Sequence, residues 1–410
     1  MAALYCCWQA SAWSSKKPDD FAKAQSALVL NADFFMVVIS SISLSSERKQ
    51  FIMNPQPQTI SDIIRGIIPI SAEWVQKATE HNAQLCIPPR ALGRLHSIAE
   101  QLCGIQKTMT PDIGRRAVLV MAGDHGVVAE GISAFPQEIT GAMIRVFLSD
   151  GAGINAICHQ VGADVWVVDM GIIPDIDPDS TPGGNRLKIE KIARGTQNLA
   201  KGPAMTREDA EKAIMAGFRQ AARLFEGGVQ ILGTGDMGIG NTTPSAAIGT
   251  VLTGINVEKM VGPGTGIKTD GIQRKIKAIL DGIAINKPDA RDGLDVLAKL
   301  GGFEIAGIAG CILAGAYYQQ PVVVDGLIST AGALIAHRLC PTVRDYLFAG
   351  HCSEEPGHRL MLNSMEMTPI LDLGMRLGEG TGAALAMNIM DGAVSIFTRV
   401  MTFQQAGITE

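Results

Sequence analysis

Four apolar runs along the chain predict strands that are buried on both faces of a sheet. They are rich in Val, Ile and Leu and continuous rather than alternating. The runs cover residues 116–126, 163–172, 228–244 and 320–330. Helical spacing of apolar residues follows over 137–160, 206–226, 243–253, 270–285 and 303–318. The alternation predicts an α/β fold, a Rossmann-like three-layer parallel sheet with helices on both faces.

Two further segments, residues 60–104 and 355–402, have helical patterns with few strand signals. We expect them to pack together as a small helical domain beside the ligand-binding edge of the sheet. The predicted boundaries are 53–110 and 353–410 for its two parts and 111–352 for the α/β domain.

Residues 1–52 lack a steady period, and Met53 opens a stretch that reads like an ordinary start. We expect a disordered or dispensable extension there, with a targeting segment as the alternative. Residues 175–189 are rich in Pro, Gly and Asp, which predicts an exposed turn region.

The strand pattern also predicts where a ligand binds, because ligands of such sheets lie beyond the carboxyl ends of the strands. Four polar loops fall there. They contain Asp124 and His125, residues 169–171, residues 233–241, and Asp325 with Gly326. Side chains far apart in sequence should therefore meet at one rim.

Composition narrows the class of protein. The 410 residues are 47% hydrophobic and 18% charged with a net charge of −5, which argues against nucleic acid as the main partner. Eight cysteines without a CxxC pair favour a reducing cytoplasm over a disulfide framework. No apolar run reaches the roughly 20 residues that span a bilayer, so no membrane partner is expected.

The loop GTGDMGIGNTTPSAAI, residues 233–248, offers glycines and a helix start to an anion. Gly238, Asn241 and Thr242 are its candidate ligand-binding residues. An ordinary turn with a capping threonine is the alternative. The loop matches neither the dinucleotide fingerprint nor the phosphate loop of nucleotide triphosphatases.

Two further loops resemble it in composition. Residues 261–275 contain Gly264 and Lys275, and a lysine beside glycine amides can bind phosphate. Residues 348–362 contain Ser353, which either caps a helix or binds an anion. His351 and His358 lack a third ligand in spacing, so we interpret them as loop or surface histidines and expect no metal.

Glu379 stands between Gly378 and Gly380 at the start of an apolar helical run over residues 381–397. The glycines would let the backbone turn sharply and expose the carboxylate. Apolar neighbours such as Leu377 would raise its pKa toward that of a general base. A glutamate favoured by the helix dipole is the alternative.

The chain resembles the nicotinate-nucleotide–dimethylbenzimidazole phosphoribosyltransferases. The matching stretches are VLVMAGDHGV, KIARGTQNLAKGPAM, GTGDMGIGNTTPSAA, AINKPDARDGLDVLAKLGGFEIAGIAG and MRLGEGTGAALAM, in family order over roughly residues 58–400. This resemblance implies that Glu379 is the catalytic base. It would take a proton from one nitrogen of the benzimidazole while the other nitrogen attacks C1′ of nicotinate mononucleotide. Nicotinate would leave, and the product would be α-ribazole 5′-phosphate.

The resemblance also implies the substrate-binding residues. Gly238, Gly264, Ser353 and Lys275 would meet the donor phosphate, and Asp236 suits a ribose hydroxyl. The base pocket would comprise Met121, Leu377, Gly378, Phe135 and Met143. Phe135 and Met143 replace the Ser and Gln of some relatives, which leaves the preferred base open.

No cofactor or metal is implied, and family members are homodimers. Two other functions stay open from the sequence. One is a phosphoribosyltransferase or nucleosidase acting on a different base, and the other is a nucleotide-binding module without catalysis.

Overall fold

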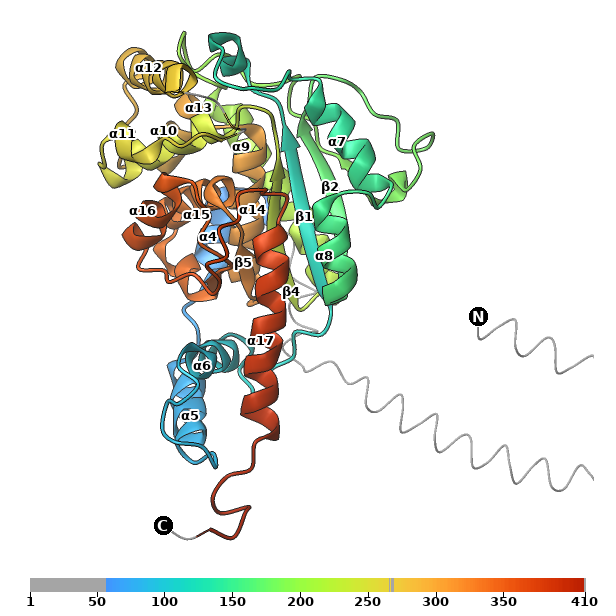
Figure 1. The fold of residues 1–410 in the computed structure, drawn as a ribbon, viewed down its shortest axis with the longest axis vertical. Helices are drawn as coiled ribbons and strands as arrows, with labels where there is room; N and C mark the ends of the chain where they lie inside the picture. The colour runs from blue at the N-terminus through green and yellow to red at the C-terminus, as the bar shows by residue number, and fades with distance from the viewer. Residues whose placement is uncertain (1–56, 265, 267–268, 409–410) are drawn as a thin grey trace, which may run out of the picture. The chain divides into compact units, whose positions relative to one another are not determined.

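Residues 57–264, 266 and 269–408 are described by the computed structural model, and Figure 1 shows their arrangement. The extension expected over residues 1–52 lies outside these residues. The described chain alternates between strands and helices from residue 116 to residue 349.

One parallel sheet forms the middle layer. Its strands are β1 Arg116–Gly123, β2 Ala163–Gly171, β3 Leu187–Ile189, β4 Ile231–Met237, β5 Val322–Val324 and β6 Leu347–Ala349. They are arranged in the order β3-β2-β1-β4-β5-β6, and every neighbouring pair is parallel. This is the Rossmann order, which confirms the predicted fold class and places the switch point between β1 and β4.

The four predicted strands are present, and two short ones were not predicted. β3 and β6 have three residues each, too few to show a pattern. The exposed turn region expected over 175–189 therefore ends in a strand, so that prediction is wrong for its last three residues.

The predicted helices are present with one break. The helices of the structure are α4 Ile60–Gly66, α5 Ala72–Ala83, α6 Arg94–Gln106, α7 Ile139–Leu148, α8 Gly153–Val161, α9 Arg207–Glu226, α10 Thr242–Thr253, α11 Val257–Met260, α12 Thr269–Asn286, α13 Gly293–Leu300, α14 Phe303–Tyr317, α15 Leu327–Leu339, α16 Pro356–Ser364 and α17 Thr381–Arg399. Among them, α11, α13 and α15 were not predicted. Short 3₁₀ turns are η1 Gly126–Glu130, η2 Gly184–Arg186 and η3 Pro341–Tyr346. The single helix expected over 137–160 is two helices, because the chain leaves helical geometry at Asp150, where φ is +57°.

Helices cover both faces of the sheet. α14 packs on β1, β2 and β4 and contacts α9 and α15. It is apolar around its whole circumference, and every residue except Tyr317 is buried, as expected for a helix in the centre of a core. On the opposite face α17 packs on β4 and β5, with α8 beside it on β2 (Figure 1).

The two terminal helical segments meet at the far end of α17. Ala78, Ala99, Cys103 and Phe397 form a small apolar cluster there, and His81 Nε2 lies 3.0 Å from the carbonyl oxygen of Phe397. Helix rise puts Phe397 about 24 Å from the start of α17. The expectation that the helical part lies beside the ligand-binding rim is therefore wrong for α5 and α6 (Figure 1). The domain boundaries at residues 110 and 352 stay predictions.

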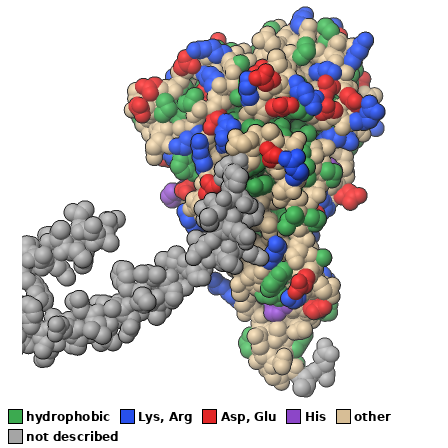
Figure 2. All heavy atoms as spheres, turned by 180° about the vertical axis from the view of Figure 1, so that it is seen from behind, with side chains coloured by type: hydrophobic (Ala, Val, Ile, Leu, Met, Phe, Trp, Pro, Cys, Tyr) green, Lys and Arg blue, Asp and Glu red, His purple; other side chains and the backbone are tan. Residues whose placement is uncertain are grey.

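Surface charges are mixed in sign. On the face drawn in Figure 2, basic and acidic side chains are interspersed over the described residues instead of gathering into one basic strip. Within the described part of the chain, no helix is long and apolar enough to cross a bilayer.

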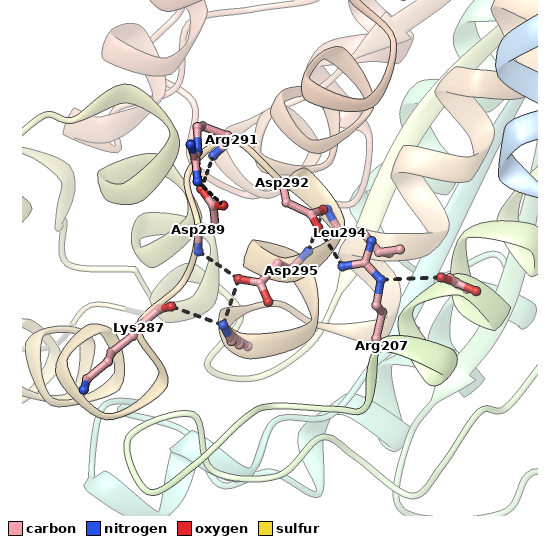
Figure 3. A network of polar contacts seen from close by, with 9 residues as sticks. Arg207, Lys287, Asp289, Arg291, Asp292, Leu294 and Asp295 are labelled. Carbon is pink, nitrogen blue, oxygen red and sulfur yellow. Dashed lines mark hydrogen bonds and ion pairs between the residues drawn. The ribbon is translucent and has the colours of Figure 1, made fainter.

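A polar network joins α9 to α13 (Figure 3). Asp292 is the N-cap of α13, and its Oδ1 accepts hydrogen bonds from Leu294 N at 3.0 Å and Asp295 N at 3.1 Å. Its Oδ2 accepts one from Arg207 at 2.7 Å. Asp292 therefore satisfies two backbone donors at a helix start and links that start to α9.

We expect Asp292→Ala to lower the free energy of unfolding by about 1–2 kcal/mol, because it leaves these N-terminal amides uncapped. Denaturant unfolding followed by circular dichroism measures the change. Arg291→Ala is the matched control, because the Arg291 side chain is 89% exposed and forms an ion pair with the nearby Asp289. Equal midpoints for the two variants would contradict the capping role.

Candidate active site

Glu379 lies in a left-handed turn of three residues. Gly378, Glu379 and Gly380 have φ values of +79°, +63° and +95°, and α17 begins at the next residue. A non-glycine residue in this region is uncommon and mildly strained, and such residues concentrate at functional sites. The sharp turn predicted from the two glycines is confirmed.

The turn packs directly on the end of β4. A Cβ at Gly235 would collide with the carbonyl group of Glu379, and a Cβ at Gly380 would lie 2.6 Å from Val118 Cγ1. The glycines therefore allow the backbones of the turn and the strand to touch. This contact brings Glu379 to the carboxyl end of β4, at the switch point of the sheet.

The carboxylate of Glu379 is held by the start of α8. Its Oε2 accepts a hydrogen bond from Ile154 N at 3.0 Å, and the residue is only 6% exposed. The expectation of an exposed side chain is therefore wrong, because α8 and the apolar side chain of Leu377 close over it. A Cβ at Gly153 would lie 2.7 Å from Leu377 Cδ2 and 3.3 Å from Glu379 Oε2.

Burial raises the pKa of Glu379 above the ordinary value for glutamate, the hydrogen bond from Ile154 opposes this, and the charge of Asp325 adds to it. The pKa direction expected from the sequence is confirmed. A carboxylate with a raised pKa that keeps one backbone donor is suited to accept a proton.

Asp236 provides a second buried carboxylate beside the turn. A Cβ at Gly378 would lie 3.5 Å from Asp236 Oδ1. Asp236 Oδ2 accepts a hydrogen bond from Asn241 Nδ2 at 2.9 Å, and its Oδ1 has no hydrogen-bond partner among the described residues. Burial, and next the charge of Asp325, raise the pKa of Asp236 to about 8. Asp236 lies beside Gly378, a residue far away in sequence, as expected for loops that meet at one rim.

Lys275 organises a cluster next to Asn241. Its Nζ donates to Thr242 Oγ1 at 2.8 Å and to the carbonyl oxygen of Gly262 at 3.2 Å. The side chain is buried, and burial lowers its pKa to about 8. A Cβ at Gly264 would lie 2.9 Å from Lys275 Nζ, so Gly264 brings its backbone to the ammonium group.

The start of α10 has no side-chain cap, although Thr243 N donates to the carbonyl oxygen of Gly240 at 3.0 Å. Asn241 occupies the N-cap position without a capping hydrogen bond from its side chain. Thr242 is the first helical residue, and its hydroxyl accepts from Lys275 instead of capping the helix. The capping threonine of the alternative is therefore wrong, and the anion site at this loop stays a prediction.

The loop of residues 348–362 contacts the cluster around Lys275 through Glu355, which was not among the predicted site residues. Glu355 Oε1 accepts a hydrogen bond from Gly264 N at 2.8 Å. Glu355 is also the N-cap of α16, so the interpretation of Ser353 as the cap is wrong. The sequence signal was available, because Glu355 precedes Pro356, a residue favoured in the first turn of a helix.

Ser353 is tied to a buried histidine. Its backbone N donates to His358 Nδ1 at 2.9 Å, and its Oγ lies at the same distance from that nitrogen. Burial, then the neighbouring His351, lower the pKa of His358 to about 3, so its ring is neutral. Both histidines are buried, which contradicts the interpretation as surface residues. No group of three potential metal ligands occurs within the described chain.

Gly238 follows β4 and packs against the end of β1. A Cβ there would collide with the carbonyl oxygen of Gly123 and lie 3.3 Å from His125 Nε2. His125 and Glu304 form a buried pair, with 2.9 Å between His125 Nε2 and Glu304 Oε1. Burial acts to lower the pKa of His125, but the Glu304 carboxylate outweighs it and the pKa is raised. A lone glutamate in the apolar run of α14 was the sequence signal for this pair.

The predicted base-pocket residues differ in their surroundings. Met121 is aligned with Asp236 across β1 and β4, is fully buried, and places its sulfur next to Gly307 of α14. Leu377 and Phe135 are 59% and 52% exposed. Met143 is half-buried in α7. Leu377 and Gly378 adjoin Glu379 in the chain, whereas no described contact ties Phe135 or Met143 to it.

A row of neighbouring residues thus leads from Glu379 to Lys275. Gly378, next to Glu379 in the chain, lies beside Asp236, which is hydrogen-bonded to Asn241, and Thr242, the next residue, is hydrogen-bonded to Lys275. One end of this row offers a proton acceptor, and the other offers an ammonium group beside a helix start without a side-chain cap. The arrangement suits a phosphorylated ligand whose reacting atom lies near Glu379.

Comparisons with known proteins agree with this chemistry. A family model described as phosphoribosyltransferase matches residues 67–408. The nicotinate-nucleotide–dimethylbenzimidazole phosphoribosyltransferase of Geotalea uraniireducens is 49% identical over 351 residues, which are 86% of this chain and 98% of the relative. The enzyme of the same name from Geobacter sulfurreducens has the same identity and coverage.

A solved structure gives the same result. The crystal structure of the enzyme of this name from Thermus thermophilus superposes with a TM-score of 0.78 at 44% identity. It covers 83% of this chain and 100% of its own chain.

The raised pKa of Asp236 predicts a pH-dependent stability. The unfolded state loses the proton near pH 3.8 and the folded state near pH 8, so this contribution is full below about pH 4 and is lost as the pH rises to about 8. The slope is at most about 1.4 kcal/mol per pH unit. Asp236→Asn should flatten it, because Asn does not titrate and still accepts from Asn241.

Denaturant unfolding at pH 5 and at pH 8 measures the effect. Between these pH values the unaltered protein should lose about 2 kcal/mol or more of unfolding free energy relative to Asp236→Asn. Parallel curves for Asp236→Asn and the unaltered protein would show that Asp236 is ionised in the folded state at pH 5.

Proposed function

The chain belongs to the nicotinate-nucleotide–dimethylbenzimidazole phosphoribosyltransferase family, and from that premise we propose how its site carries out the transfer. The enzyme moves the phosphoribosyl group of nicotinate mononucleotide to 5,6-dimethylbenzimidazole or a related base, giving α-ribazole 5′-phosphate and nicotinate. Glu379 in the 378–380 turn is the observation that carries the assignment of the general base, because it is a buried carboxylate with a raised pKa at the switch point.

In the proposed reaction, Glu379 accepts one proton while one bond to C1′ forms and another breaks. Its carboxylate takes the N–H proton of the benzimidazole, and the other ring nitrogen forms a bond to C1′ of the ribose. The C1′ bond to the pyridinium nitrogen breaks, and its electron pair stays with nicotinate. The leaving group is cationic before it departs, so no general acid is required. Attack opposite the leaving group inverts C1′ from β to α.

The row of residues from Glu379 to Lys275 supports a proposed position for the donor. Lys275, Thr242, Gly264 and Gly238 would bind the 5′-phosphate, with Ser353 at the edge of the same cluster. The phosphate would add a negative charge beside Lys275, which would raise the pKa of Lys275 and favour its ammonium form. Asp236 Oδ1, which lacks a partner among the described residues, would form a hydrogen bond with a ribose hydroxyl, and Asn241 donates to the other oxygen.

Leu377 and Gly378 would line the base pocket next to Glu379, with Met121, Phe135 and Met143 as its proposed remaining wall. The apolar character of these side chains suits a methylated aromatic ring. We also propose that the enzyme is a cytoplasmic homodimer that uses neither a metal nor a cofactor. The family resemblance supports the homodimer. The absence of a CxxC pair among the cysteines supports a reducing compartment such as the cytoplasm.

We expect Glu379→Gln to keep the fold and to lose at least about 100-fold in kcat, because the amide cannot accept the proton. The measurement is nicotinate and α-ribazole 5′-phosphate formation from the two substrates by mass spectrometry. Glu366→Gln is a matched control at a glutamate in a left-handed position outside the site. A Glu379→Gln protein with full activity would remove Glu379 from the mechanism.

Product identity also separates the two other functions. A nucleosidase releases nicotinate and ribose phosphate without coupling to the base. A binding module binds nicotinate mononucleotide and releases no nicotinate.

We expect Lys275→Met to raise KM for nicotinate mononucleotide at least about 10-fold with a smaller change in kcat, because an ammonium–phosphate contact is lost. In the unaltered enzyme KM should rise as the pH passes about 8, where Lys275 loses its charge. Lys277→Met is the control, because Lys277 is on the same helix and its side chain is 75% exposed. Equal KM values for the two variants would contradict the phosphate role.

A further inference from the structure

Helix α17 begins without a cap of its own. Its N-cap residue, Gly380, has no side chain, and the residue before it is Glu379. The backbone amides at a helix start need acceptors when they are buried. Here the acceptor comes from the loop after β5, far away in the sequence.

The side chain of Asp325 accepts hydrogen bonds from two backbone amides at the start of α17. Its Oδ2 accepts from Gly380 N at 3.2 Å, and its Oδ1 accepts from Ala383 N at 3.0 Å. Asp325 directly follows β5, whose three residues are all fully buried. The carboxylate therefore bridges a central strand of the sheet and the first turn of α17.

The surroundings fix Asp325 in place. It is fully buried, and His351 Nε2 lies 3.7 Å from its Oδ1. The His351 ring in turn packs on the first turn of α17, where a Cβ at Gly382 would overlap it. Asp325 has no freedom to follow a displaced helix, so α17 must begin where Asp325 lies.

We propose that Asp325 is a positioning residue for the transfer reaction: its carboxylate fixes the 378–380 turn and so sets the place and the charge environment of the Glu379 carboxylate. Gly380, the amide that Asp325 binds, is bonded directly to Glu379. A displacement of Gly380 would therefore move Glu379 away from Ile154 N and from the base. This inference depends on the proposed role of Glu379.

The negative charge of Asp325 gives it an effect on Glu379 that a purely structural helix cap would not have. Asp325 opposes ionisation of Glu379 and of Asp236, so it helps to keep the pKa of Glu379 raised after burial, which is the larger cause. Among the described residues, the other titratable groups near these carboxylates include His351, beside Asp325, and Glu304, which faces Asp236. Removing the charge at 325 should therefore lower the pKa of Glu379.

The test compares Asp325→Asn with Asp325→Glu in the full chain, with nicotinate mononucleotide and dimethylbenzimidazole as substrates. Asn keeps one acceptor and loses the charge, whereas Glu keeps the charge and displaces it. We expect kcat to fall at least about 10-fold in both, with KM for nicotinate mononucleotide changed less than about threefold. The acidic limb of the kcat profile should move to lower pH by about half a unit or more in Asp325→Asn alone.

Asp292→Asn is the matched control, because it makes the same chemical change at a helix cap outside the site. It should leave kcat and the acidic limb unaltered. Circular dichroism shows whether each variant is folded. Where Asp325→Asn is not folded, Asp325→Glu decides, and a wild-type kcat in that variant overturns the proposal.

Failure of this inference can be told apart from failure of the proposed function. Full activity in Glu379→Gln contradicts the function itself. An inactive Glu379→Gln together with an Asp325→Asn enzyme that keeps the wild-type kcat, or the wild-type acidic limb, overturns only the role of Asp325.

Discussion

The direct contact between the 378–380 turn and the end of β4 is the constraint on which the site depends. Two backbones can approach this closely only where neither carries a side chain at the contact, and Gly235 and Gly380 meet that condition. The left-handed turn then aims Glu379 at the start of α8. Any larger residue at either glycine would separate the helix from the strand and move the carboxylate away from the switch point.

A second constraint is electrostatic. Asp236, Asp325 and Glu379 lie close together in a buried region, where each ionised carboxylate opposes the ionisation of the others. Backbone amides at the starts of α8 and α17 offset part of this cost by donating hydrogen bonds. Burial also lowers the pKa of Lys275, so both ends of the site have groups that can change charge near neutral pH.

Much of the architecture was predictable because its signals are local. The apolar runs predicted β1, β2, β4 and β5, and periodicity predicted the long helices. The two three-residue strands β3 and β6 could not be predicted, because pairing with a neighbouring strand, and not their own pattern, makes them strands. The break between α7 and α8 shows the same limit, since helical periodicity continues through a turn that the backbone of Asp150 decides.

By itself, the sequence determined the fold class, the glycine-lined rim and the sharp turn around Glu379, because each leaves a pattern within a few neighbouring positions. The role of Glu379 as the general base is a proposal that the family resemblance supports. Only the tertiary structure decided that Glu379 is buried, that Glu355 rather than Ser353 occupies the N-cap position of α16 and contacts Gly264, and that Asp325 caps α17. These relations join segments tens of residues apart. Burial and hydrogen-bond partners of this kind arise when separate elements pack, so no local pattern contains them.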